Sequence, residues 1–354
     1  KRLPMEGSLP RPARSRPLEQ PTAPPARRRD AVPNLPLVLA LLAALALTFV
    51  LTENRRIERS HFEGRTRRGT DDLRERRIPP VIWQTWRSRP DPATPLGRQV
   101  RLLRARNPSH LYNFVDDKEQ AAFMRTNVTG DVAKAYFSID PENGAARADL
   151  WRYCVLYRYG GWYVDLDVGC RAPLRDLHSA GDELAFAYER SPLPTAVPSS
   201  LSCVAPQTFD ANVSQLLRSR SFFRRRCIAQ NIIGSAPGSL PLKAAIDRVV
   251  SSLREMKSAR EALCLQEYTP SKRDLAKNHS WTWLRTIWLT GPFALTVALR
   301  DYVERHPASS KQMGTFDAHK TGCLSSKKVN AAMASERPKY GSLVKERPFL
   351  VAPS

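Results

Sequence analysis

Two aspartates, Asp165 and Asp167, stand two residues apart in an otherwise apolar stretch, residues 162–168. The stretch predicts a β-strand, on which residues i and i+2 face the same side. Two carboxylates on one side of a buried strand repel each other and are costly to desolvate without a partner. Mg²⁺ and Mn²⁺ are suitable partners because they prefer carboxylate and phosphate oxygens. The pattern therefore predicts that Asp165 and Asp167 hold a metal ion, which would stabilise charge on a departing phosphate. In the alternative, the strand ends at Asp165 and the acids face solvent or arginines.

A second pair of charges, Asp149 and Arg152, precedes the two acids on a predicted helix, residues 141–159. Residues three apart share a helix face. The pair Gly160-Gly161 is expected to end this helix and to turn the chain into the strand. Taken alone, Asp149 and Arg152 would form a surface ion pair. Taken with the acids, they would line the same pocket, with Arg152 near a hydroxyl or phosphate and Asp149 near sugar or ribose hydroxyls.

Strands and helices alternate along the part of the chain that must position these residues. The predicted strands are residues 81–86, 111–115, 162–168 and 184–188, and the predicted helices are residues 96–106, 118–124, 141–159, 241–256 and 292–305. At the start of the 141–159 helix, Asp140 is expected to act as the cap and Pro141 to occupy the first turn. Alternation of this kind favours an α/β domain with a mostly parallel sheet, which binds ligands at the carboxyl ends of its strands.

The first 77 residues are expected to lie outside the catalytic domain. Residues 1–34 are rich in Pro and Arg and predict a disordered cytoplasmic tail. Residues 35–51 carry no charge and would span roughly 26 Å as a helix, so residues 35–52 are expected to form a single transmembrane anchor rather than a cleaved signal. Residues 53–77 are expected to be a charged stem, and residues 78–354 the lumenal catalytic domain.

Arginines flank both ends of the anchor, so the positive-inside rule does not decide its orientation. Sequons at Asn127, Asn212 and Asn278 are compatible with a lumenal C-terminal domain, that is, a type II protein of the Golgi membrane. The net charge of +22 is compatible with anionic substrates, an anionic membrane or nucleic acid. The chain lacks the interleaved aromatic and basic residues of nucleic-acid modules, so no nucleic-acid role is expected.

Six cysteines are present, and none forms a C-x-x-C pair, so a zinc site is not expected. An even number of cysteines in an oxidising compartment allows disulfides without establishing them. Cys154 and Cys170 lie in predicted core segments and are expected to be buried free thiols.

The run from Arg147 to Cys170, R-A-D-L-W-R-Y-x-V-L-Y-x-Y-G-G-x-Y-x-D-L-D-V-G-C, strongly resembles glycosyltransferase family 32. Residues 78–86 resemble the opening strand of that family, except that Trp83 stands where the family usually has His. Residues 231–238 and 290–292 resemble two later segments of the family, so that the similarity covers about residues 78–305.

This resemblance implies a GT-A (Rossmann-like) fold, a nucleotide-sugar donor and a retaining transfer that depends on Mn²⁺ (or Mg²⁺). It places Trp86 near the nucleotide base, and Asn231 with Asp149, Arg152 and Asp165 at the donor site. The motif D-L-D-V-G-C followed by Arg171 is most similar to the members that mannosylate inositol-phosphoceramide. GDP-mannose is therefore the expected donor and a glycan or glycolipid the expected acceptor. Two alternatives stay open: a UDP-sugar-dependent α-galactosyl- or N-acetylglucosaminyltransferase, and a catalytically inactive sugar-binding or scaffold homologue.

Overall fold

The computed structural model describes residues 76–192, 226–257, 285–326, 329 and 349–351. The expected tail and anchor, nearly all of the expected stem, and the sequons at Asn212 and Asn278 lie outside these residues. Within the described ranges, no helix has both the length and the apolar character needed to cross a membrane.

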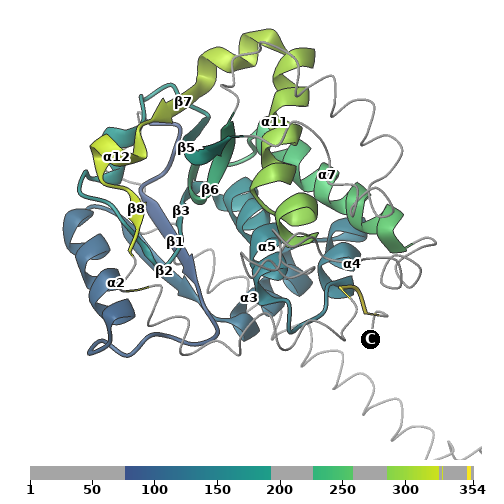
Figure 1. Cartoon of the computed structure of the whole chain (residues 1–354), viewed down its shortest axis with the longest axis horizontal. Coiled ribbons are helices and arrows are strands. Elements are labelled where there is room, and N and C mark those ends of the chain that lie inside the picture. The colour runs from purple at the N-terminus through teal and green to yellow at the C-terminus, as the bar shows by residue number, and fades with distance from the viewer. Residues whose placement is uncertain (1–75, 193–225, 258–284, 327–328, 330–348, 352–354) are drawn as a thin grey trace, which may run out of the picture. The chain divides into compact units, whose positions relative to one another are not determined.

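A sheet of six strands forms the centre of the described part, in the order β2-β1-β3-β6-β5-β7 (Figure 1). The strands are β1 (Val81–Thr85), β2 (Leu111–Val115), β3 (Gly161–Val164), β5 (Leu184–Pro192), β6 (Arg226–Ser235) and β7 (Met313–Phe316). Strand β1 pairs in parallel with both β2 and β3, whereas β6 is antiparallel to β3 and to β5. Strand β7 pairs in parallel with β5, so the expected mostly parallel arrangement is found in β2-β1-β3 and in β5-β7, and β6 lies antiparallel between them. Antiparallel neighbours need no crossover helix, so helix–strand alternation does not reveal this part of the sheet.

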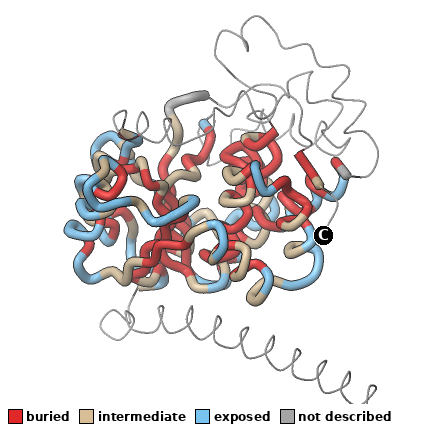
Figure 2. The backbone as a smooth tube through the Cα atoms, turned by 90° about the horizontal axis from the view of Figure 1, so that it is seen from below, coloured by how far each residue is buried: buried red, intermediate tan, exposed pale blue. Residues whose placement is uncertain are grey.

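Helices cover both faces of the sheet. They are α2 (Pro95–Arg106), α3 (Asp117–Asn127), α4 (Gly130–Ser138), α5 (Gly144–Tyr159), α7 (Leu240–Lys257) and α11 (Pro292–Arg305). Short elements are β4 (Val168–Gly169), η1 (Leu174–Leu177), η3 (Thr286–Thr290), η4 (Pro307–Gln312), α12 (Ala318–Thr321) and β8 (Leu324–Ser325). Figure 2 shows the buried residues concentrated along the central strands and on the inner sides of the helices. One apolar cluster joins β1 to α3, α5, α7 and α11, and another joins the opposite side of β1 to α2 and η1.

Helix α5 begins later than its sequence suggests. Its cap is Asn143, whose side chain accepts a hydrogen bond from the Ala146 N–H, and the helix starts at Gly144. Asp140 instead accepts a hydrogen bond from the Glu142 N–H in the turn that precedes the helix. The expected start at Pro141 with an Asp140 cap is therefore wrong, because Asp140 is used by this turn.

The end of α5 is where the sequence predicts it, at Gly160, which has a φ of 67°. A side chain at this position would collide with Pro79 and Pro237, so only glycine fits this left-handed turn. Trp83 of β1 is fully buried and donates its indole N–H to the Gly160 carbonyl at 2.9 Å. Trp83 thus fastens β1 to the turn that leads into β3.

A disulfide joins Cys170, directly after β4, to Cys323, directly before β8. The expectation of a free thiol is wrong for Cys170 and is confirmed for Cys154, which is buried and unpaired. The two linked cysteines lie 153 residues apart in sequence, a pairing that no local pattern reveals. The disulfide secures the antiparallel pair β4–β8 immediately after the two aspartates.

Candidate functional site

The site lies where the direction of the chain across the sheet reverses. From β1 the chain moves to β2 on one side and later returns to β3 on the other side of β1. Open α/β sheets bind ligands at such switch points, beyond the carboxyl ends of the strands. The buried side chain of Gln84 joins the two strand ends here, since its amide donates to the carbonyls of Val164 (3.1 Å) and Asp165 (3.3 Å).

Asp165 and Asp167 lie on a tight turn directly after β3 rather than on the strand itself. The strand ends at Val164, and the Val168 N–H donates to the Asp165 carbonyl at 3.0 Å, which closes the turn. The expectation that both acids belong to one strand and share its side is therefore wrong. The backbone of each acid is bonded elsewhere: the Asp165 N–H donates to the Asn231 carbonyl (2.8 Å), and the Asp167 carbonyl accepts from the Ser326 N–H (2.8 Å).

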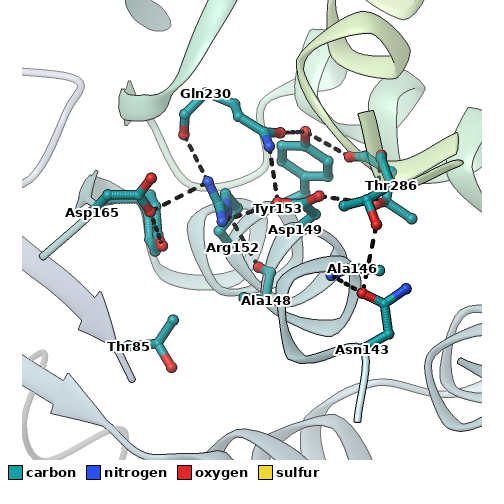
Figure 3. Close-up of polar contacts among 12 residues, drawn as sticks. Thr85, Asn143, Ala146, Ala148, Asp149, Arg152, Tyr153, Asp165, Gln230 and Thr286 are labelled. Carbon is teal, nitrogen blue, oxygen red and sulfur yellow. Dashed lines mark hydrogen bonds and ion pairs between the residues drawn. The ribbon is translucent and has the colours of Figure 1, made fainter. Parts of the chain in front are cut away.

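The carboxylate of Asp165 is oriented by two neighbours. Arg152 Nη1 lies 3.6 Å from Asp165 Oδ1 (Figure 3). The Tyr163 hydroxyl donates to the same oxygen at 2.5 Å. Burial raises the pKa of Tyr163 well above its usual value, so its hydroxyl keeps the proton that it donates. The side chain of Asp165 is 32% exposed. The protein therefore fixes this carboxylate and still leaves it accessible to a ligand.

Asp149 and Arg152 form an ion pair at 2.9 Å, with side chains only 2% and 6% exposed. The two residues share a helix face as expected. Their ion pair is buried, so the alternative of a surface ion pair is wrong. Two neighbours satisfy Asp149. Gln230 Nε2 donates to its carboxylate at 2.9 Å (Figure 3), and the Thr290 hydroxyl donates to it at 2.9 Å as well. A buried charge needs this full set of partners, because desolvation would otherwise exceed the gain from pairing.

The guanidinium of Arg152 is held on several sides. Nη1 donates to the Gln230 carbonyl at 3.0 Å, Nε donates to the Ala148 carbonyl at 3.3 Å, and the group lies 4.2 Å from the centre of the Tyr163 ring. Burial lowers the pKa of Arg152, but the groups around it, Tyr163 and Asp165 foremost, outweigh this and raise the pKa above its ordinary value. Arg152 is thus a permanent cation that connects the buried Asp149 to the exposed Asp165.

The carboxyl group of Asp149 is the titratable member of this network. Burial raises its pKa to about 6, although Arg152 and the hydrogen bonds from Thr290 and Gln230 act in the opposite direction. A group that ionises near pH 6 is charged at neutral pH and loses its charge under mildly acidic conditions. Perturbed acids of this kind are common at functional sites.

The two remaining sequence-predicted residues also border the turn. Trp86 follows β1 and packs against an apolar cluster that includes Leu166, the residue between the two aspartates. Asn231 of β6 accepts from the Asp165 N–H through its carbonyl, and its side-chain amide donates to the Ser325 hydroxyl at 3.4 Å. The structure therefore brings all six sequence-predicted residues to one region around the turn: Trp86, Asp149, Arg152, Asp165, Asp167 and Asn231.

Several residues of the network were not predicted from the sequence. Gln230 is central, because it donates to Asp149, accepts from Arg152 through its carbonyl, and accepts from the Tyr153 hydroxyl at 2.6 Å. Its position next to Asn231 was the one available signal. Thr290 was noted only within the segment 290–292, and Tyr163 only as part of a longer run. The contacts of Gln230 and Thr290 with Asp149 join segments more than 75 residues apart and have no local pattern.

The residues at the turn fit a divalent cation. Among the described residues, no three His, Cys, Asp or Glu side chains are clustered so that they could hold a metal. Mg²⁺-type ions do not require such a cage, since they are often held by one or two carboxylates and complete their shell with phosphate oxygens and water. Asp165 and Asp167 supply the carboxylates that this mode of binding needs.

Residues 97–186 match the protein family described as "Glycosyltransferase sugar-binding region containing DXD motif". This segment is thus similar to the sugar-binding region of glycosyltransferases that contain a DXD motif. It includes Asp149 and Arg152 on α5 as well as Asp165 and Asp167 on the turn after β3. The matched segment therefore contains both pairs of charged residues that the structure connects.

Curated relatives match over 100 to 121 residues of the chain. The chain is 35% identical to inositol phosphoceramide mannosyltransferase 3 of Schizosaccharomyces pombe over 100 residues. This stretch is 28% of this chain and 27% of the relative. It is 38% identical over 100 residues to inositol phosphoceramide mannosyltransferase 2 of the same yeast, 28% of each chain. The initiation-specific alpha-1,6-mannosyltransferase of Candida albicans is 30% identical over 121 residues, 33% of this chain and 31% of that protein. The matches span less than a third of the length of each relative.

Among solved structures, the PaToxG glycosyltransferase aligns with 84% of this chain and 98% of its own, at 11% identity. The TM-score is 0.38, which is too low to carry an argument about this chain.

Proposed function

We propose that this chain is a metal-dependent, retaining glycosyltransferase that transfers mannose from GDP-mannose to a glycan or to a glycolipid of the inositol-phosphoceramide type. One observation carries the proposal. Within the DXD sugar-binding region, a turn at the carboxyl end of β3 presents Asp165 and Asp167, and the buried pair Asp149–Arg152 supports it from behind. This arrangement suits a ligand with a negatively charged diphosphate better than a neutral sugar alone.

In this proposal, Asp165 and Asp167 hold Mn²⁺ or Mg²⁺. The ion supplies positive charge that binds the diphosphate and stabilises it as it leaves the sugar. The protein contributes rigidity: the Tyr163 hydroxyl and Arg152 fix Asp165 before any ligand arrives. A preorganised carboxylate needs no rearrangement at the moment of reaction, and this is the main way in which enzymes lower electrostatic barriers.

Asp149 and Arg152 are proposed donor-site residues that act through their neighbours. Both are almost fully buried, and their polar atoms already have partners in the protein. Arg152 therefore acts on the donor by orienting Asp165, and Asp149 acts by holding Arg152. Trp86 is proposed to lie near the nucleotide base, because it follows β1 at the switch point and packs beside Leu166.

The fold class and the membrane topology are part of the same proposal. We assign a GT-A fold, supported by the parallel strands β2-β1-β3 and by the acidic turn at the end of β3. We also propose that residues 35–52 anchor the chain in the Golgi membrane as a type II protein with the catalytic domain in the lumen. The apolar composition of residues 35–51 supports the membrane anchor, and the sequons at Asn127, Asn212 and Asn278 are compatible with a lumenal domain.

The acceptor is proposed from the relatives. Two of them are named inositol phosphoceramide mannosyltransferases, and a third is named an alpha-1,6-mannosyltransferase. All three names give mannose as the transferred sugar, and only the first two name an acceptor. Both acids of the D-x-D motif are present, which argues against the scaffold alternative.

The deciding experiment is a donor screen with the purified full chain. GDP-mannose, UDP-galactose and UDP-N-acetylglucosamine are each supplied with and without Mn²⁺, with inositol-phosphoceramide or a mannose oligosaccharide as acceptor. We expect Mn²⁺-dependent transfer from GDP-mannose. Turnover only with a UDP-sugar would favour the first alternative, and no turnover with any donor at high Mn²⁺ would favour the scaffold.

A further inference from the structure

Helix α2 and the segments beside it carry an unusually one-sided charge. Residues 86–110 contain six arginines and a single acid, Asp91. The neighbouring helices α3 and α4, residues 117–138, contain three basic and three acidic residues. The two stretches have similar lengths, so the difference is not a general consequence of the basic composition of the chain.

The positive charge of α2 is exposed and is not neutralised by the protein. Its four arginines, Arg98, Arg101, Arg104 and Arg106, are all exposed, and none of them forms an ion pair with an acid in the described ranges. Their side-chain contacts are with neutral groups: the ring of Tyr112 and the carbonyls of Pro92 and Cys170. Helices α7 and α11 behave differently, because each pairs a basic residue with an acid one turn away.

An exposed leucine lies among these arginines. Leu102 is 42% exposed and stands four residues from both Arg98 and Arg106, so it shares a helix face with them. Leu324 of β8 is 40% exposed, and β8 pairs with β4, the strand against which α2 packs. Exposed arginines are attracted to an anionic membrane surface, and an exposed leucine beside them can enter the boundary between headgroups and acyl chains.

We propose that the exposed face of α2, formed by Arg98, Arg101, Leu102, Arg104 and Arg106, docks on the surface of a bilayer that contains anionic phospholipids. The arginines pair with phosphate groups, and Leu102 enters the boundary between headgroups and acyl chains. Nucleic acid is the less suitable polyanion, because α2 has no aromatic side chain on which a base could stack.

The position of α2 gives this docking a consequence. Helix α2 contacts β4, and Gln99 of α2 lies against Gly169, two residues after Asp167. A bilayer held by α2 would therefore lie on the side of the domain next to the acidic turn. The docking follows from charge and exposure and does not depend on the proposed transferase activity.

The test uses the full chain and two exposed leucines. Hydroxyl-radical footprinting, resolved by peptide, compares oxidation of Leu102 on α2 with oxidation of Leu240, which is 59% exposed and belongs to α7. The chain is mixed with vesicles of phosphatidylcholine alone or of phosphatidylcholine and phosphatidylinositol in equal amounts. Because the readout is local, it reports on α2 whichever other segment of the chain binds the membrane. We expect Leu102, and not Leu240, to be protected several-fold, and only by the vesicles that contain phosphatidylinositol.

Charge variants sharpen the test. Each arginine at an anionic surface contributes about five-fold to binding, so Arg98→Gln with Arg101→Gln should raise the vesicle concentration needed for protection of Leu102 roughly 30-fold. The matched control, Lys134→Gln with Arg254→Gln, removes the same charge from exposed positions on α4 and α7 and should leave that concentration unchanged. Equal protection of both leucines, an equal effect of the control variant, or protection of Leu102 by added RNA but not by vesicles would each overturn the proposal.

Discussion

The two charged pairs of the segment that matches the DXD family differ sharply in their surroundings. Asp149 and Arg152 are almost fully buried, and each is satisfied by other parts of the protein. Asp165 and Asp167 lie on a turn, and about a third of the Asp165 side chain is exposed. Arg152 connects the two pairs through its contact with Asp165.

This difference implies two roles: the buried pair supports the site, and the turn binds the ligand. Removing one partner of a buried pair leaves an uncompensated charge in the interior, so the buried pair should affect stability as well as activity. A partly exposed carboxylate can be solvated when its ligand is absent, so the turn should affect activity far more than stability. Measuring both quantities on the same variants therefore tests the comparison directly.

The largest effect on activity is expected at the turn. Asp167→Ala should reduce kcat/KM by roughly 10²–10³-fold or more, because it removes a carboxylate that the proposed metal needs. The free energy of unfolding should change by less than about 1 kcal/mol, as is usual for residues outside the core. Donor turnover and urea unfolding provide the two measurements. As a control, Asp301→Ala on α11 removes an acid of similar exposure and should leave turnover intact. Retention of most activity by Asp167→Ala would refute the metal assignment.

The largest effect on stability is expected at the buried pair. Arg152→Ala should lower the free energy of unfolding by about 3–5 kcal/mol, because Asp149 is then left buried without its cation. The variant Asp149→Leu with Arg152→Met removes both charges and should recover part of this loss. Urea titrations of the single and double variants measure the difference. A double variant that is less stable than Arg152→Ala would contradict the idea that an unpaired charge causes the loss.

The sequence predicted the parts of this site that local rules control. The 3.6-residue periodicity of the helix correctly placed Asp149 and Arg152 on one face, and Gly160 ended α5 as expected, because only glycine adopts that backbone without strain. The sequence was misleading where a backbone contact from a distant segment decides the structure. The turn at Asp165 depends on the carbonyl of Asn231 in β6, a strand that the sequence did not predict.

Burial was the other property that the sequence could not supply. A polar pair on a helix looks the same in a sequence whether it faces water or a second layer of structure. Only the packing of β6 and η3 against α5 shows that Gln230 and Thr290 enclose Asp149. The disulfide of Cys170 could not be predicted from the sequence either, because its partner Cys323 lies 153 residues away.

A smaller effect is expected for Gln230, which supports the buried pair without carrying charge. Gln230→Leu keeps most of the side-chain volume but removes the hydrogen bonds to Asp149 and Tyr153. Outer-shell contacts of this kind typically change activity about 10–100-fold, and the loss of stability should be about 1–3 kcal/mol. Gln120→Leu is the matched control, since this buried glutamine bonds Thr85 and Tyr136 instead of Asp149. Comparable losses of activity in both variants would show that Gln230 has no special role in supporting Asp149.

The smallest effect concerns pH. The pKa of Asp149 is raised by burial to about 6, so the transfer rate should fall as the pH decreases through 6 and the partner of Arg152 loses its charge. Stability should depend on pH in the opposite direction to the transfer rate. Because the pKa of Asp149 is raised in the fold, its carboxyl group stabilises the fold at low pH, and this contribution is lost as the pH rises through about 6.

Thr290→Val tests whether Asp149 causes this pH dependence of the transfer rate. It removes a hydrogen bond to the ionised form of Asp149, so the pKa should rise further, by about 0.5–1 unit for a bond worth about 1 kcal/mol. The acid limb of the rate profile should move upward by the same amount. Thr296→Val, at a buried threonine of α11 that bonds Pro292 and Ile228 instead, should leave the limb in place. If Thr290→Val lowered the rate equally at every pH, the hydrogen bond would serve packing and not the charge of Asp149, and the buried pair would be a structural support without a pH-dependent role.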